Sequence, residues 1–138
     1  MQAGQRLDKI ERRKGPYWDC RELLAHEKER SERNNHFFAL CGVVFTDYPG
    51  TDPIDFLKSE LRNSDYIFSV PSKEDLSPAG AKVGLLLPET DLLGGELVYE
   101  RIKELCSARK VQVQVGLAIY PDDGTVPREI LEKAFTAR

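Results

Sequence analysis

Residues 111–121, VQVQVGLAIYP, decide the fold, because apolar side chains alternate there with polar or small ones. Valine, leucine or isoleucine occupies every odd-numbered position from 111 to 119, while Gln112, Gln114 and Gly116 fall on the opposite face. A period of two is typical of a strand that is buried on one side. The sequence therefore predicts a half-buried strand, followed by a DDGT turn and a last helix over residues 126–135.

Three further strands are predicted upstream. Residues 36–45, HFFALCGVVF, are rich in β-branched and aromatic side chains, which indicates a central strand buried on both faces. Asp52-Pro53 then predicts a helix cap with proline at the first helical position. Residues 65–70 (DYIFSV) and 82–89 (KVGLLLPE) are the second and third strands, separated by a polar connection.

Helical patterns complete the order. Asp19 and Glu22 have the spacing of an N-terminal cap ahead of a charged helix, and Thr90 or Asp91 caps a longer helix downstream. The order helix, βαββαβ, helix predicts an α+β protein. Its ferredoxin-like sheet is antiparallel in the middle and carries helices on one face.

Length and composition limit the remaining choices. The 138 residues suffice for one domain, which we place at 19–138 after a linker or partly ordered extension at 1–18. A net charge of −3 argues against a general nucleic-acid binder. Three scattered cysteines without CxxC spacing indicate reduced thiols in a cytoplasmic protein, with no metal cluster. The sequence contains no apolar run long enough to span a membrane.

Five segments in the right order resemble the GGDEF domain of bacterial diguanylate cyclases. They are LLAHEKERSERNNHFFALCGVVF (23–45), LRNSDYIF (61–68), VGLLLPET (83–90), VQVQVGLAIYPDDG (111–124) and ILEKAFTAR (130–138). The resemblance runs from about Asp19 to the end of the chain. It implies a compact GGDEF-like sheet, which is compatible with the ferredoxin-like order predicted above.

The resemblance places Ala79-Gly80-Ala81-Lys82-Val83 at the GGDEF signature. In an active cyclase the acidic pair of the signature supplies a metal ligand and catalytic charge, since carboxylates hold the Mg²⁺ that neutralises the triphosphate. Ala81 offers no ligand and Lys82 reverses the sign of the charge. Asp47 is the one carboxylate near the position of the other metal ligand, and the family's substrate-contacting stretch after it is missing. We therefore expect no cyclase activity and no cofactor.

Arg62-Asn63-Ser64-Asp65 has the R-x-x-D form of the family's inhibitory product site. The resemblance implies that Arg62 would bind a phosphate or guanine edge and that Asp65 would accept guanine N–H groups. The alternative is a solvated helix end next to a strand-start carboxylate, because R-x-x-D is frequent by chance. The longer connection at residues 71–80 also departs from the family's spacing.

Other motifs have structural explanations. Gly94-Gly95 lacks phosphate-loop spacing and predicts helix packing, and Asp122-Asp123-Gly124 predicts a turn. An RNA-recognition module would need exposed aromatic side chains where Gln112 and Gln114 stand. The sequence thus predicts a catalytically inactive regulatory or scaffolding module of a bacterial signalling or polysaccharide-related protein. Its partner would be another protein or the rest of a larger chain, and the alternative is a cyclic di-GMP receptor acting through Arg62 and Asp65.

Overall fold

The computed structural model describes residues 18–47, 49–70 and 81–136. In chain order the elements are α2 (Trp18–Asn34), β1 (Phe38–Phe45), α3 (Pro53–Leu57), the 3-10 turn η1 (Lys58–Glu60), β2 (Tyr66–Val70), β3 (Lys82–Pro88), α4 (Leu92–Ala108), β4 (Val113–Tyr120) and α5 (Pro127–Ala134). This order is the predicted one. Residues 1–17 of the predicted extension lie outside the described residues. Helix α2 begins at Trp18, so Asp19 lies inside the helix and not at its cap.

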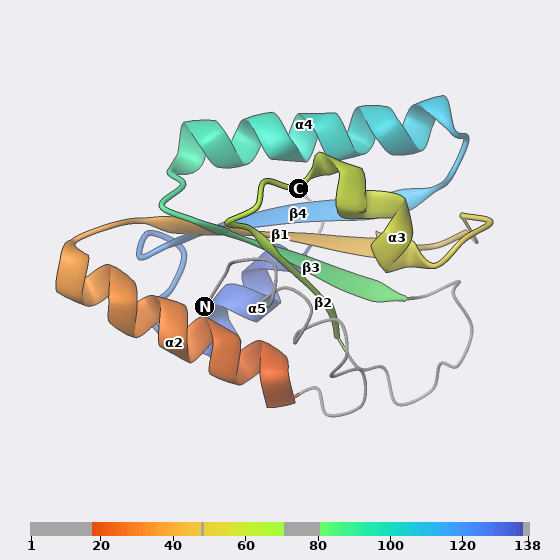
Figure 1. Cartoon of the computed structure of the whole chain (residues 1–138). Helices are drawn as coiled ribbons and strands as arrows, with labels where there is room; N and C mark the ends of the chain where they lie inside the picture. Colours follow the sequence, from red (N-terminus) through yellow and green to blue (C-terminus); the bar gives the residue numbers. More distant parts are fainter. Residues whose placement is uncertain (1–17, 48, 71–80, 137–138) are drawn as a thin grey trace.

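The four strands form one antiparallel sheet in the order β2-β3-β1-β4 (Figure 1). Strand β1 is central, and its first residue, Phe38, is paired with Pro88 of β3 and with Tyr120 of β4. Seven of its eight residues are buried, as expected for a strand covered on both faces. The ferredoxin-like α+β order is confirmed.

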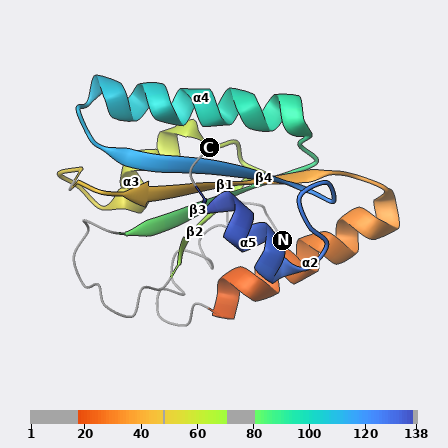
Figure 2. The same cartoon turned by 180° about the vertical axis from the view of Figure 1, so that it is seen from behind.

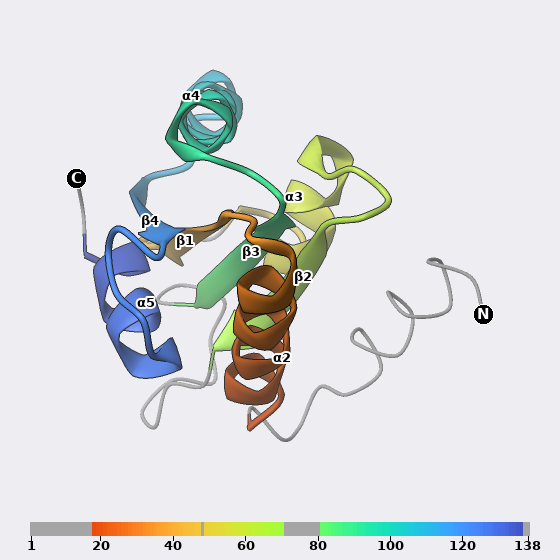
Figure 3. The ribbon, with the colours of Figure 1, turned by 90° about the vertical axis from the view of Figure 1, so that its left-hand side faces the viewer.

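Helices cover both faces of the sheet, so the prediction of helices on one face is wrong (Figures 1 and 3). Helices α3 and α4 cover the face formed by Val115, Leu117 and Ile119, which confirms the predicted phase of β4. Helices α2 and α5 cover the other face, where Leu24 and Ile130 are buried. The remaining buried members of this second core are Phe38, Leu40, Tyr66, Phe68, Leu86, Ala118, Tyr120 and Ala134.

Gly42, Gly84 and Gly116 lie side by side across the middle of the sheet, because Gly42 pairs with both of the others. A Cβ atom on Gly42 or Gly116 would collide with the main-chain carbonyl of Ala134, and one on Gly84 would collide with the ring of Phe68. The missing side chains at Gly42 and Gly116 let the end of α5 approach the backbone of the sheet, as Figure 2 shows from behind, and the one at Gly84 leaves room for the Phe68 ring.

Side-chain caps fix the helices of the first face. The Asp52 carboxylate accepts the Ile54 N–H at 2.8 Å with Pro53 at the first turn, as predicted. Of the two residues predicted to cap α4, Asp91 does so by accepting the Gly94 N–H at 3.0 Å. Gly95 is buried against Leu117 and Ile119, which confirms its packing role. No described helix is long and apolar enough to cross a membrane.

Candidate functional site

The turn between η1 and β2 brings Arg62 and Asp65 into direct contact. The Asp65 N–H donates to the Arg62 carbonyl at 3.0 Å, and the Arg62 N–H donates back to the Asp65 carboxylate at 2.8 Å. The guanidinium adds Nε contacts of 3.2 and 3.3 Å and an Nη2 contact of 2.9 Å to the same carboxylate. This hydrogen bonding to Asp65 is the main cause that raises the pKa of Arg62.

Exposure differs sharply within the pair. The Asp65 side chain is 2% exposed and the Arg62 side chain is 60% exposed. The carboxylate therefore lies under the guanidinium, with both of its oxygens bonded to Arg62. The buried carboxylate differs from the solvated helix end considered from the sequence. That Arg62 and Asp65 bind a ligand stays a prediction.

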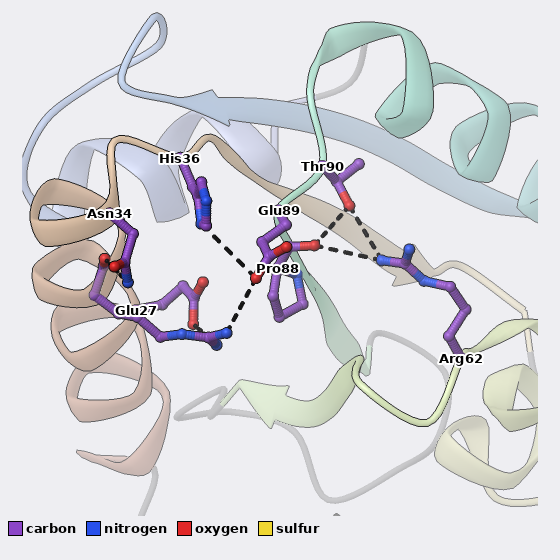
Figure 4. Close-up of polar contacts among 8 residues, drawn as sticks. Glu27, Asn34, His36, Arg62, Pro88, Glu89 and Thr90 are labelled. Carbon is purple, nitrogen blue, oxygen red and sulfur yellow. Dashed lines mark hydrogen bonds and ion pairs between the residues drawn. The ribbon is translucent and has the colours of Figure 1, made fainter.

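Arg62 also contacts the loop that follows β3 (Figure 4). Its Nη2 donates to the Thr90 hydroxyl at 3.2 Å and approaches the Pro88 carbonyl at 3.4 Å. The Thr90 hydroxyl in turn donates to the Pro88 carbonyl at 3.0 Å, and Thr90 is buried. Arg62 thus joins the start of β2 to the end of β3.

Glu89, between these two loop residues, faces the opposite way and contacts α2. Its backbone φ is 53°, a left-handed conformation that is uncommon outside glycine. The carboxylate lies 3.2 Å from Arg30 and 3.7 Å from His36 (Figure 4). Arg30 also lies 3.5 Å from the buried Glu27, whose pKa is raised chiefly by burial. Sequence reasoning missed this chain of contacts, for which the only signal was the i, i+3 spacing of Glu27 and Arg30.

A groove of about 530 Å³ opens beside Arg62. Arg62 and Arg101 lie on its wall from different elements, together with the carboxylates of Glu89 and Asp91. The other lining residues are Asn35, His36, Phe37, Thr90, Gly94, Leu97 and Val98. The groove therefore combines charges of both signs with apolar surface.

The segment that the resemblance places at the GGDEF signature is described only from Ala81 onward. Ala79 and Gly80 lie outside the described residues, as does the connection 71–78. Lys82 begins β3, opposite Val44 of β1, and Val83 is buried in the core. The Ala81 carbonyl accepts the Phe45 N–H at 2.9 Å, which continues the sheet. Asp47 is exposed, two residues beyond the end of β1.

The other residues considered from the sequence, His26, the 122–124 turn and the cysteines, show no sign of a binding site where the structure describes them. His26 is exposed on α2. The turn at 122–124 is closed by Asp123, whose N–H donates to the Ile119 carbonyl at 2.7 Å. Burial raises the pKa of the Cys41 thiol to about 12 and that of Cys106 to about 11, so both remain protonated at neutral pH. Within the described ranges, no three His, Cys, Asp or Glu side chains are grouped as metal ligands.

Comparison with known proteins finds similarity in structure and not in sequence. No protein-family model matches the chain, and no curated protein matches it significantly. The GGDEF domain of TpbB (YfiN) from Pseudomonas aeruginosa superposes with a TM-score of 0.62 at 14% identity, covering 83% of this chain and 76% of that one. A diguanylate cyclase (DGC) protein from Thermotoga maritima gives 0.65 at 15% identity, with coverages of 84% and 88%.

The diguanylate cyclase SiaD from Pseudomonas aeruginosa, solved in complex with its activator SiaC, gives a TM-score of 0.67 at 20% identity. The match covers 85% of this chain but only 50% of SiaD, so the chain spans half the length of that protein. At these identities the likeness concerns the fold. The described part of this chain therefore has the fold of GGDEF domains, an α+β sheet with helices packed on it.

Proposed function

We propose that this chain is a non-catalytic regulatory or scaffolding module with a GGDEF-type fold, within a bacterial signalling or polysaccharide-related protein. The observation that carries the proposal is Lys82 at the start of β3, opposite Val44 of the central strand. Cyclase chemistry on GTP needs carboxylates that hold Mg²⁺ near the triphosphate. Neither the methyl group of Ala81 nor the ammonium group of Lys82 can coordinate a cation, and the ammonium repels one.

The other side of the expected metal site supports the same conclusion. Asp47 offers a single exposed carboxylate after β1. Only residues 48–52 separate it from Pro53, where α3 begins, so the chain leaves little room for the additional substrate-contacting stretch of the family. One carboxylate gives a divalent cation too few protein ligands for a two-metal reaction.

The groove beside Arg62 favours the second candidate, a receptor that binds cyclic di-GMP without turnover. Arg62 is largely exposed and lines the groove together with Arg101, so two cations face a space of about 530 Å³. However, Asp65 is buried and its carboxylate is bonded to Arg62. A guanine could use Asp65 only if this pair first opened, and Glu89 and Asp91 would repel a phosphate. We therefore place the protein-contact role first.

A cyclase assay tests the first proposal. The protein is incubated with GTP and either Mg²⁺ or Mn²⁺, and cyclic di-GMP is separated by chromatography. We expect no product from the unmodified chain, and none after Ala81→Asp combined with Lys82→Glu, because the substrate-contacting stretch is also missing. Product from the unmodified chain above a no-protein control would refute the proposal.

Calorimetric titration with cyclic di-GMP decides between the two candidates. We expect no tight binding. A low-micromolar dissociation constant that is lost in both Arg62→Ala and Arg101→Ala would establish the receptor function instead. Arg128→Ala is the matched control, because Arg128 is an exposed arginine on α5 across the sheet. Arg101→Ala is the cleaner variant, since Arg62→Ala also leaves the buried Asp65 carboxylate without its guanidinium.

A further inference from the structure

The outer edge of β4 presents main-chain groups that the sheet does not use. Strand β4 lies at the end of the sheet and is paired with β1 only. Toward β1, the Gln112 carbonyl accepts the Thr46 N–H at 3.0 Å. Hydrogen-bonding direction alternates along an antiparallel strand, so the odd-numbered residues must point outward. Val113, Val115 and Leu117 therefore direct their N–H and C=O groups to the outer edge.

Ile119 provides independent support for this direction. Its N–H donates to the Asp123 carboxylate at 2.8 Å and its carbonyl accepts the Asp123 N–H at 2.7 Å, both away from β1. The 122–124 turn thus caps the last outward residue of the edge. Among the residues that the structure describes, none is seen to bond the outward groups of Val113, Val115 and Leu117. An edge with unused donors and acceptors is a template for another strand.

A groove of about 860 Å³ runs between this edge and the C-terminal half of α4, which lies above β4 in Figure 1. Lys103 and Lys110 are the charged residues of its lining. Its lining also includes Tyr99 of α4 and Val113 and Val115 of β4. The Lys103 ammonium lies 5.1 Å from the centre of the Tyr99 ring, at the groove wall. Neither lysine takes part in an ion pair seen between described residues.

We propose that this groove binds an extended acidic segment of a partner protein, which adds to the sheet alongside β4. The edge supplies main-chain hydrogen bonds. Lys103 of α4 and Lys110, two residues beyond the end of this helix, select glutamate or aspartate side chains on the face of the peptide that points toward the helix. Complementary charge fixes the choice of partner. A second copy of this chain fits less well, because pairing two β4 edges would bring the lysine-lined grooves of both copies together.

The inference names a partner and a surface for the proposed scaffolding role, and it rests on that role for its biological meaning. The non-catalytic proposal and the edge proposal can be refuted independently of each other. Cyclic di-GMP synthesis would refute the non-catalytic proposal without affecting the edge, and absence of peptide binding would refute the edge proposal without restoring catalysis.

The test uses the full chain, labelled with ¹⁵N, and a capped octapeptide of alternating glutamate and threonine. At millimolar peptide we expect the amide signals of Val115 and Leu117 to shift, with titration giving a dissociation constant. The same peptide with lysine for glutamate should bind at least about tenfold more weakly, as expected when charge-assisted contacts are lost. Unshifted Val115 and Leu117 signals, or equal binding of both peptides, would overturn the proposal.

The Val113→Pro variant tests whether main-chain hydrogen bonds of the β4 edge contribute to peptide binding. Val113 is the first residue of β4 and its N–H points outward, so proline removes one edge donor and no bond to β1. We expect peptide binding to weaken about three- to tenfold relative to Val113→Ala, which keeps the N–H. Lys103→Glu with Lys110→Glu should reverse the preference and favour the lysine peptide, and these exposed positions avoid the core. Binding unchanged by all these variants, or dimerisation of the unmodified chain that is abolished by Val113→Pro, would overturn the proposal.

Discussion

Replacing Gly116 by alanine should destabilise the protein, although the same change in an open strand would stabilise it. Gly116 has no positive φ, so alanine fits the backbone and would gain about 0.4–1 kcal/mol by restricting the unfolded chain. In the folded protein, however, the new methyl group would collide with the carbonyl oxygens of Ala134 and Thr136. Backbone atoms at the end of α5 cannot turn aside as a flexible side chain can. The sign of the effect therefore reports whether α5 lies against the glycines.

The folded protein can respond to the new methyl group in two ways, and their costs set the range of the expected loss of stability. If α5 stays in place, overpacking costs about 1–3 kcal/mol. If α5 leaves the sheet, Ile130 and Ala134 lose their burial, which costs about 1.5–3 kcal/mol for the isoleucine and about 0.8 kcal/mol for the methyl group. Both residues are almost completely buried. The chain adopts the cheaper response, and the restricted unfolded chain returns about 0.4–1 kcal/mol of it. We therefore expect a net loss of about 1–2 kcal/mol, compared with an ordinary stability of about 5–15 kcal/mol.

Urea unfolding followed by circular dichroism measures this loss, and the slope m separates the two responses. A strained but docked α5 leaves m unchanged, whereas an undocked helix reduces the surface exposed on unfolding and lowers m. Gln114→Ala is the control on the same strand, where the side chain is exposed and a change within about 0.5 kcal/mol is expected. A Gly116→Ala variant as stable as the unmodified chain, or more so, would refute the position of α5 and the reasoning built on it.

Three further predictions use the same core. Val115→Asp places an unpaired carboxylate under α4 and should cost several kcal/mol, enough to unfold a marginal domain, while Gln114→Ala costs little; equal melting temperatures of the two would contradict the assigned faces of β4. The buried thiols of Cys41 and Cys106, with pKa values of about 12 and 11, should resist Ellman's reagent at pH 8 in the folded protein and react in urea; rapid reaction of both in the native state would show that the core is open. Because burial raises the pKa of Glu27, its contribution to stability is complete below the ordinary carboxyl pKa of 4.5 and is lost as the pH rises through the folded value. From pH 4 to pH 7 the unmodified chain should therefore lose stability relative to the Glu27→Gln variant. If it gained stability relative to that variant, the pKa of Glu27 would be lowered by folding and not raised.

The sequence alone predicted the elements whose signal is local. The alternation over residues 111–119 fixed which side chains of β4 face α4, because successive side chains of a strand point to opposite faces. Asp52 and Pro53 marked the start of α3, since a cap depends on neighbouring residues only. The order of these elements predicted the ferredoxin-like sheet, and the resemblance of five segments to GGDEF domains implied the arrangement that the structural comparisons show.

Other features depend on residues far apart in the chain, and only the tertiary structure decided them. The second face looked open because Gln112 and Gln114 are polar. However, Gln112 precedes β4 and Gln114 is its second residue, and α2 and α5 cover the rest of that face. Arg62 and Asp65 have the spacing of a ligand site, but the sequence does not show which of the two side chains is exposed. The fold buries the Asp65 carboxylate under the Arg62 guanidinium, and this guanidinium also contacts Thr90 in the loop after β3.

The row of three glycines and the free outer edge of β4 also could not be predicted from the sequence. No local rule indicates that Gly42, Gly84 and Gly116 share one row, because their alignment is set by strand register across the sheet. Likewise, a strand pattern predicts that residues 113–120 pair with a neighbour but does not say on which side a neighbour is missing. Pairing partners and burial are sums over distant contacts, so the periodicity of this sequence determines its elements, and their packing determines its surfaces.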